Sequence, residues 1–302
     1  MSRSNSPLAQ LGARAMLGLL WLIHGLPLGV LAALGRGLGL LLYALAGSRR
    51  RVARRNLQLC LPELDDQARE ALLRQHFQWL TRSILERAVI WYAPPERLKR
   101  LIRIEGDVGF AERHPGAVMW LTPHFVALDV AGAATTLFQK RWIGTIYQRQ
   151  SNPVFDAAMR QGRLRHGGGE AFARSETALP LVRAIKRGAG FINLPDMDFG
   201  SRDAAFVPFF GVPAATLLAP ARMAATLKMT VQPVVADILP GGQGYRIRYL
   251  EPWADFPTGD ELADTRRINA WIETEIRRNP AQYLWVHRRF KTRPPGEPSL
   301  YT

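Results

Sequence analysis

The sequence predicts an α/β fold: a twisted mixed sheet covered by helices, with an N-terminal membrane helix and a helical layer before the sheet. Three observations lead to this prediction. A long apolar segment lies near the N-terminus, a helical periodicity follows it, and short apolar runs of strand length then alternate with helical patterns. The 302 residues and the 47% apolar content are sufficient for a sizeable core.

The N-terminal region predicts a membrane anchor. We expect residues 1–15 to form a polar N-terminus and residues 16–47 to form the anchoring helix, because His24 is the only strongly polar side chain between Met16 and Gly35. About 20 helical residues match the roughly 30 Å hydrocarbon core of a bilayer. Pro27 and several glycines favour a kinked helix or one lying in the interface as the alternative to a span. A cleaved signal peptide is disfavoured because the apolar region is too long.

The distribution of charge predicts an orientation and a class of partner. No acidic residue precedes Glu63, whereas a cluster of arginines follows the apolar segment at 49–55. By the positive-inside rule, residues 48–302 face the cytoplasm. The net charge of +15 indicates an anionic partner such as nucleic acid, acidic lipid headgroups, a phosphorylated substrate or an acidic carrier protein. The single cysteine, Cys60, excludes an intramolecular disulfide and a cysteine-based zinc site.

Residues 48–302 divide into a helical layer at 48–103 and an α/β core at 104–302. Within the layer, apolar residues recur at helical spacing from Leu72 to Ala88, and Pro94-Pro95 ends it. Glu86 lies on or beside the apolar face, where pairing with a neighbouring arginine is the favoured interpretation. In the core, apolar runs predict strands near 117–121, 142–147, 190–194, 231–236 and 245–250.

The predicted chemistry centres on His124, which follows the strand that Pro123 ends. A histidine at the carboxyl edge of an α/β sheet can accept a proton from a hydroxyl at neutral pH if a carboxylate holds its other ring nitrogen. Asp129, five residues on, is the candidate carboxylate. The spacing alone also fits an unrelated loop histidine and a helix N-terminal acid. A Gly-x-Ser-x-Gly nucleophile motif and a glycine-rich phosphate loop are both missing from the sequence.

The chain resembles the lysophospholipid acyltransferase superfamily, and most closely its bacterial lipid A late acyltransferase family of lauroyl and myristoyl transferases. The blocks that carry the resemblance keep their order along nearly the whole chain. They are 55–62, the box from His124 to Asp129, 152–153 with 162–165, 194–200, 206–211, 231–233 and 282–294. The resemblance implies that His124 and Asp129 are catalytic.

Further candidate site residues follow from the same comparison and from their place at the sheet edge. Arg163 and Arg165 are expected to bind a phosphate of the acceptor. Asp196 and Asp198 follow a predicted strand and are expected to contact the acceptor; no metal and no cofactor are expected. The apolar run at 206–210 is expected either to line an acyl groove or to pack in the core, and the cationic stretch from His287 to Arg293 either to bind an anionic partner or to remain solvated.

Together these observations predict an acyltransferase of the bacterial inner membrane, with its catalytic domain on the cytoplasmic face. It transfers a fatty acyl chain from acyl carrier protein to a hydroxyl of a lipid A precursor, with His124 as the general base. Membrane lipids are expected partners and nucleic acid is not. Another glycolipid, such as a phosphatidylinositol mannoside, or a lysophospholipid is the alternative acceptor. A basic, membrane-tethered nucleic-acid-binding protein is the alternative outside enzymes, disfavoured because aromatic and basic residues do not alternate on any predicted strand.

Overall fold

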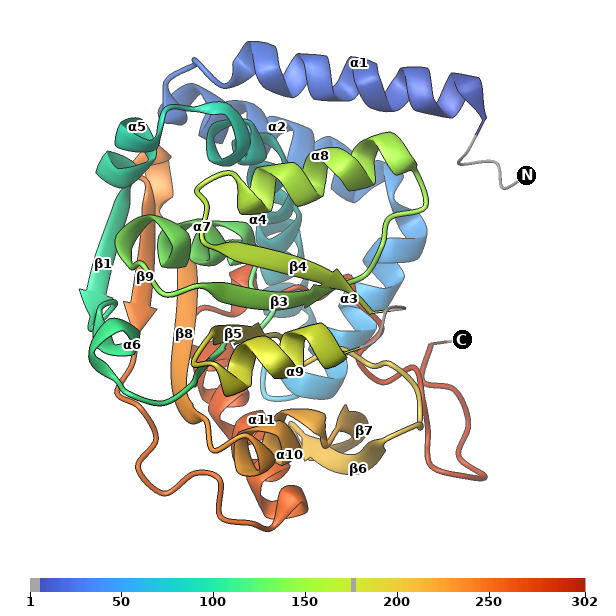
Figure 1. The fold of residues 1–302 in the computed structure, drawn as a ribbon. Helices are drawn as coiled ribbons and strands as arrows, with labels where there is room; N and C mark the ends of the chain where they lie inside the picture. Colours follow the sequence, from blue (N-terminus) through green and yellow to red (C-terminus); the bar gives the residue numbers. More distant parts are fainter. Residues whose placement is uncertain (1–5, 175–177, 302) are drawn as a thin grey trace.

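The computed structural model describes residues 6–174 and 178–301, which form one large mixed sheet between layers of helices (Figure 1). The seven strands of this sheet follow the order β1-β9-β8-β2-β5-β3-β4. Only β8 and β9 pair antiparallel, and every other neighbouring pair is parallel. The predicted mixed sheet covered by helices is confirmed. The strands are β1 Ile102–Gly106, β2 Val118–Leu121, β3 Ile143–Tyr147, β4 Gly169–Ala173, β5 Gly190–Asn193, β8 Thr230–Ile238 and β9 Tyr245–Tyr249.

The five predicted strands are the interior strands of this sheet, and each lies within a residue or two of its predicted place. The two strands that the sequence did not predict, β1 and β4, are the edge strands. Edge strands need only one buried face and carry charged residues such as Arg103 and Glu105, which removes the continuous apolar run of an interior strand. A separate antiparallel hairpin, β6 (Ala204–Phe209) and β7 (Val212–Leu217), packs on α11 (Glu261–Arg278).

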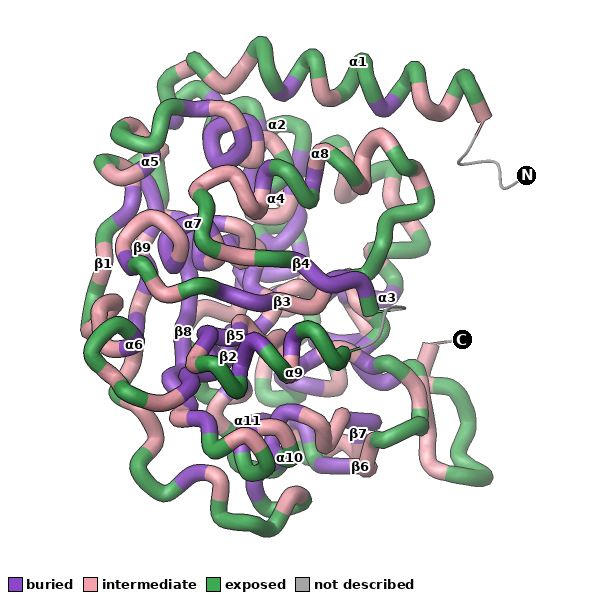
Figure 2. The backbone as a smooth tube through the Cα atoms, in the orientation of Figure 1, coloured by how far each residue is buried: buried purple, intermediate pink, exposed green. Residues whose placement is uncertain are grey.

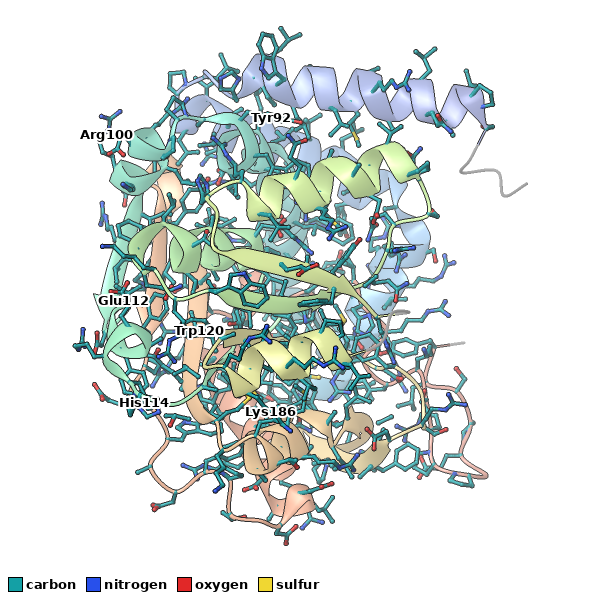
Figure 3. The ribbon with its side chains drawn as sticks, in the orientation of Figure 1. Tyr92, Arg100, Glu112, His114, Trp120 and Lys186 are labelled. Atoms are coloured by element: carbon teal, nitrogen blue, oxygen red, sulfur yellow. The ribbon has the colours of Figure 1, made fainter. Side chains whose placement is uncertain are left out.

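Strand β2 lies at the centre and is buried on both faces. Val118 and Trp120 belong to the core beneath α7 (Leu128–Phe138) and α8 (Pro153–Leu164), and the intervening Met119 and Leu121 belong to the opposite core, beneath α9, α10 and α11. Helices α9 and α10 are Leu179–Lys186 and Ala219–Thr226. Trp120 lies among the central strands, whereas Arg100 projects from the edge of the molecule (Figure 3). Alternate side chains of β2 thus face different cores, so both faces of the strand are buried and its sequence is apolar throughout.

The predicted helical layer consists of α3 (Gly47–Cys60), α4 (Asp66–Tyr92) and α5 (Pro95–Leu101). Pro95 is the first residue of α5, so the proline pair joins two helices and does not end the layer. Glu86 forms a buried ion pair with the Nε atom of Arg82 at 2.5 Å, which confirms the structural interpretation of this acid.

The residues predicted to form one anchoring helix form two, α1 (Pro7–Ile23) and α2 (Leu28–Leu45). Helix α1 already begins at Pro7, so no break lies between the predicted polar N-terminus and the apolar segment. Helix α2 packs along α4, where a Cβ atom on Gly39 would lie 2.5 Å from the Cα atom of Gln78. Among the described helices, α2 alone is long and apolar enough to cross a membrane. Helix α1 is exposed along most of its length (Figure 2).

Candidate active site

Two loops meet at the carboxyl edge of the sheet, one after β2 and one after β5. These strands are parallel neighbours, with Leu121 opposite Asn193. The backbone N–H of Thr122 donates to the carbonyl of Asn193 at 2.9 Å, which extends the pairing into the loops. His124 lies three residues after Leu121, and Asp196 lies three residues after Asn193. The register of the two strands therefore brings the side chains of His124 and Asp196 together.

The contact between His124 and Asp196 is doubly hydrogen-bonded. The backbone N–H of His124 donates to Asp196 Oδ2 at 2.9 Å, and its ring Nδ1 lies 2.7 Å from Asp196 Oδ1. An ionised carboxylate can only accept hydrogen bonds, so Nδ1 carries the ring proton. The other nitrogen, Nε2, therefore keeps its lone pair, and this is the arrangement that a general base requires.

Asp196 is completely buried beneath this contact. Burial opposes its ionisation, but the adjacent His124 and its two hydrogen bonds outweigh burial and lower the pKa of Asp196. The neighbouring phenol of Tyr283 responds to the same surroundings, because burial and the charge of Asp196 raise the pKa of Tyr283 well above its usual range. Asp196 is thus an anion and Tyr283 a neutral phenol at physiological pH.

Asp129 is not the carboxylate that holds His124, and the predicted pairing of these two residues is wrong. Its Oδ2 atom accepts from Arg87 Nε at 2.7 Å, and its Oδ1 atom accepts from Arg163 Nε and Nη2 at 3.1 and 2.9 Å. Burial opposes the ionisation of Asp129, but the two guanidinium groups outweigh it and lower the pKa of Asp129. Asp129 lies in the first turn of α7, where its carboxylate also faces the positive end of the helix dipole.

A cavity of about 480 Å³ opens over both carboxylate clusters. His124, Asp129 and Arg163 line it together with His287, and its remaining wall is largely apolar. The apolar side chains of the wall include Leu80, Val126, Ile146, Met159, Phe191, Ile192, Leu194, Phe199 and Leu217. The cavity therefore offers one base, several cations and a surface for a hydrocarbon chain.

The family model for bacterial lipid A biosynthesis acyltransferases matches residues 3–292 of this chain. The chain belongs to this family. It is 32% identical over 288 residues to the lipid A biosynthesis lauroyltransferase of Escherichia coli (strain K12), covering 94% of this chain and 93% of that protein. It is 33% identical over 292 residues to the palmitoleoyltransferase of the same strain, covering 94% and 92%. For the myristoyltransferase the identity is 31% over 297 residues, covering 97% and 90%.

In this acyltransferase the two predicted arginines have different surroundings. Arg163 lies in the cavity, in agreement with its predicted place. Arg165 does not line the cavity: its Nη1 and Nη2 atoms donate to the carbonyls of Ile90 and Ala93 at 3.3 and 2.8 Å. These carbonyls belong to the C-terminal end of α4, so Arg165 caps that helix end.

Asp196 and Asp198, which were predicted to contact the acceptor, both bind groups of the protein itself, and neither lines the cavity. Asp196 holds His124, as described above. Asp198 accepts hydrogen bonds from the backbone N–H and the hydroxyl of Thr292, at 2.6 and 2.8 Å, and from the backbone N–H of Gly200 at 2.9 Å. Asp198 therefore fastens the C-terminal segment to the loop after β5. Across 6–174 and 178–301, no group of three or more His, Cys, Asp or Glu side chains is arranged to hold a metal ion.

The apolar run at 206–210 does not line the cavity. Phe209 is fully buried in contact with Tyr283 and Phe290, so the core-packing interpretation of this run is confirmed. In the cationic stretch from His287 to Arg293, Arg289 is buried and has a structural role, whereas Arg288 and Lys291 are exposed. Arg289 donates to Ala215 O and to the hydroxyl of Thr216 at 2.8 and 2.7 Å.

His287 lines the cavity but was not singled out from the sequence, and the same holds for Arg87 and Arg174. The segment that carries His287 pairs with the loop after β2. Phe125 and Tyr283 form an antiparallel bridge, and the N–H of Leu284 donates to the carbonyl of His124 at 3.0 Å. The neighbours of His287, Arg288 and Arg289, are basic, and a histidine among arginines is typical of a solvated basic tail. The only available signal was the apolar stretch Tyr283–Val286 immediately before it, which indicates that the segment is buried.

Proposed function

We propose that this acyltransferase moves a fatty acyl group from an acyl carrier protein thioester to a hydroxyl of a lipid A precursor, with His124 Nε2 as the general base. The observation that carries the proposal is the contact of His124 with Asp196, because it presents an unprotonated nitrogen to an apolar cavity. Family membership supports the acceptor class. The net charge of +15 favours both an acidic carrier and a phosphorylated acceptor.

The proposed reaction is a direct transfer. His124 Nε2 removes the proton of the acceptor hydroxyl as its oxygen attacks the thioester carbonyl. The C–S bond then breaks, and the imidazolium returns the proton to the leaving thiolate. Asp196 stabilises the imidazolium that forms between these steps and keeps the ring in one orientation, which makes it a positioning residue.

The cations of the cavity favour an acceptor that carries phosphate. Arg87, Arg163 and Arg174 line the cavity, and Asp129 is the one carboxylate among the described lining residues. Two guanidinium groups share the charge of Asp129, so the cluster keeps a positive excess. We assign Asp129 to the active site as the residue that holds these arginines in place, with the phosphate of the acceptor bound by their remaining N–H groups.

Helices α1 and α2 support a location at the inner membrane. Large apolar side chains on both helices are exposed, among them Leu19, Trp21, Leu22, Leu38, Leu41 and Leu45. Arg49 and Arg50 lie in the first turn of α3, shortly after α2, so we propose that α1 and α2 hold the protein in the membrane with the cavity on the cytoplasmic side.

The test is a transfer assay with purified protein in detergent. Acyl carrier protein thioester is the donor, and a lipid A precursor, a lysophospholipid and a phosphatidylinositol mannoside are offered as separate acceptors. Mass spectrometry should find one added acyl chain on the lipid A precursor, and none with His124→Ala at an unchanged melting temperature. Preferential acylation of either other lipid would refute the proposed acceptor, and a fully active His124→Ala would refute the mechanism.

A further inference from the structure

His287 is held in the cavity by contacts from three segments of the chain. Its carbonyl accepts from Asn56 Nδ2 at 2.7 Å, and its own N–H donates to Leu284 O at 3.2 Å. On the ring, Nε2 accepts from the backbone N–H of Asp198 at 3.2 Å. Asp198 is itself fixed by Thr292 and Gly200, so the imidazole has little freedom to rotate.

The contact with Asp198 determines the tautomer of His287. A backbone N–H can only donate, so Nε2 must carry a lone pair, and the single proton of a neutral imidazole is then on Nδ1. Burial, the charge of His124 and that of Arg289 lower the pKa of His287 to about 4, with Asp196 and Asp198 opposing them. The ring is therefore neutral at pH 7 and presents one N–H donor.

This donor has no acceptor among the residues that the structure describes. Three charged neighbours in or below the cavity already have partners: Asp196 holds the His124 ring, and Arg87 and Arg163 hold Asp129. His287 lines the same cavity as His124. A second general base is excluded, since Nε2 of His287 is occupied by Asp198 and Nδ1 is protonated.

From this geometry we propose that His287 is a catalytic residue of the acyl transfer, whose Nδ1–H donates a hydrogen bond to the thioester oxygen as that oxygen becomes an oxyanion. The inference rests on the function proposed above. When the acceptor oxygen attacks, the π electrons of the C=O bond move onto this oxygen, while the hydroxyl proton passes to His124. When the C–S bond breaks, the electrons return to re-form the carbonyl of the ester, and the thiolate takes the proton from His124.

A neutral donor suits this position better than a cation does. The transition state places a positive charge on His124, and a second imidazolium beside it would repel that charge. A fixed, neutral N–H in a largely apolar cavity stabilises the oxyanion without having to reorganise. Losing one such donor lowers kcat by about 10²–10³-fold in enzymes that use an oxyanion hole.

Two substitutions separate the donor from the structural contact. In His287→Asn the amide Nδ2 can take the place of ring Nδ1, so the donor is kept while the contact with Asp198 is lost. In His287→Gln the amide Oε1 can take the place of ring Nε2, so the contact with Asp198 is kept while the donor is lost. The proposal predicts that Asn keeps a kcat within about 10-fold of the unsubstituted protein, whereas Gln loses about 10²-fold or more with little change in KM.

A purely structural role predicts the reverse order, with Gln the more active and the more heat-stable protein. Melting temperatures are measured beside kcat and KM, using acyl carrier protein thioester and lipid A precursor as substrates. If Asn fails to fold, Gln alone decides, because an unchanged kcat in Gln overturns the proposal. A raised KM for the acceptor at constant kcat also overturns it, since that result assigns His287 to acceptor binding.

The tautomer is tested independently of activity. With ¹⁵N-labelled histidine in the intact protein, His287 should show a protonated Nδ1 and an unprotonated Nε2 at pH 7, with His287→Gln used to assign the signals. The opposite tautomer, or an imidazolium, would overturn the inference. If the unsubstituted protein transfers no acyl group to any lipid, the function proposed above fails, whereas this tautomer measurement remains valid.

Discussion

Two buried aspartates in one cavity have opposite relations to the chemistry. Asp196 faces a single imidazole, which can be neutral or charged, whereas Asp129 faces two guanidinium groups, which are always charged. Both carboxylates have lowered pKa values and both are ionised at neutral pH. Since both aspartates are buried, the group that each one binds, and not its burial, determines its role in the reaction. Asp196 can respond to a proton arriving on His124, and Asp129 can only neutralise a fixed charge.

The largest expected effect separates the two aspartates most directly. Asp196→Asn removes the charge that stabilises the imidazolium and permits the wrong tautomer of His124. We expect kcat to fall about 10³-fold with KM nearly unchanged, by analogy with general-base sites that lose their orienting carboxylate. Steady-state kinetics over a range of pH is the measurement. A loss confined to KM would show that Asp196 does not act through His124.

The second prediction concerns the charge balance around Asp129. Asp129→Asn leaves two guanidinium groups without their counter-charge in the cavity where His124 must become positive. We therefore expect kcat to fall roughly 10- to 100-fold, less than for Asp196→Asn. Stability should also fall, because the two arginines lose their ionic partner. We expect a loss of only about 1–3 kcal/mol, since both arginines are partly exposed and water screens their charge. If Asp129→Asn abolished transfer while Asp196→Asn retained it, the assignment of the two roles would have to be exchanged.

A double-mutant cycle and a pH series sharpen this second prediction. Asp129→Asn combined with Arg87→Gln should be less destabilised than the two single changes added together, by about 1–2 kcal/mol.

The folded pKa of Asp129 is lowered, so its stabilising effect is complete above the unfolded pKa of about 4 and is lost as pH falls through the folded pKa. The difference in melting temperature between the unsubstituted protein and Asp129→Asn should therefore be constant from pH 6 to 8 and shrink below pH 4.

Much of the fold could be predicted from the sequence, because interior strands carry uninterrupted apolar runs that a local pattern detects. The edge strands β1 and β4 lack such runs and were missed. The partner of His124 was missed for a different reason. Asp129 is near His124 along the chain, whereas Asp196 is near it only through the pairing of β2 with β5, which brings distant residues together. The partners of Arg165 and Asp198 could not be predicted for the same reason, since they lie on α4 and in the C-terminal segment.

The third prediction tests whether the arginine cluster recognises the acceptor. Arg163→Gln removes a guanidinium group from the cavity, so we expect KM for the lipid A precursor to rise about 10-fold, with a smaller change in kcat. The same substitution should matter much less for a precursor without its phosphates. An equal rise in KM for both acceptors would place Arg163 outside phosphate recognition. The kinetics are measured at several ionic strengths, because screening weakens a charge contact.

The smallest expected effect comes from Arg165→Gln, which serves as the matched control for Arg163→Gln. Both substitutions remove one positive charge from the C-terminal end of α8, but Arg165 donates to the last carbonyls of α4 and does not line the cavity. We expect a loss of about 1 kcal/mol in stability from these hydrogen bonds and KM for the acceptor within about twofold of the unsubstituted protein. If Arg165→Gln raised KM as strongly as Arg163→Gln, net charge near the sheet edge, and not contact within the cavity, would determine acceptor binding.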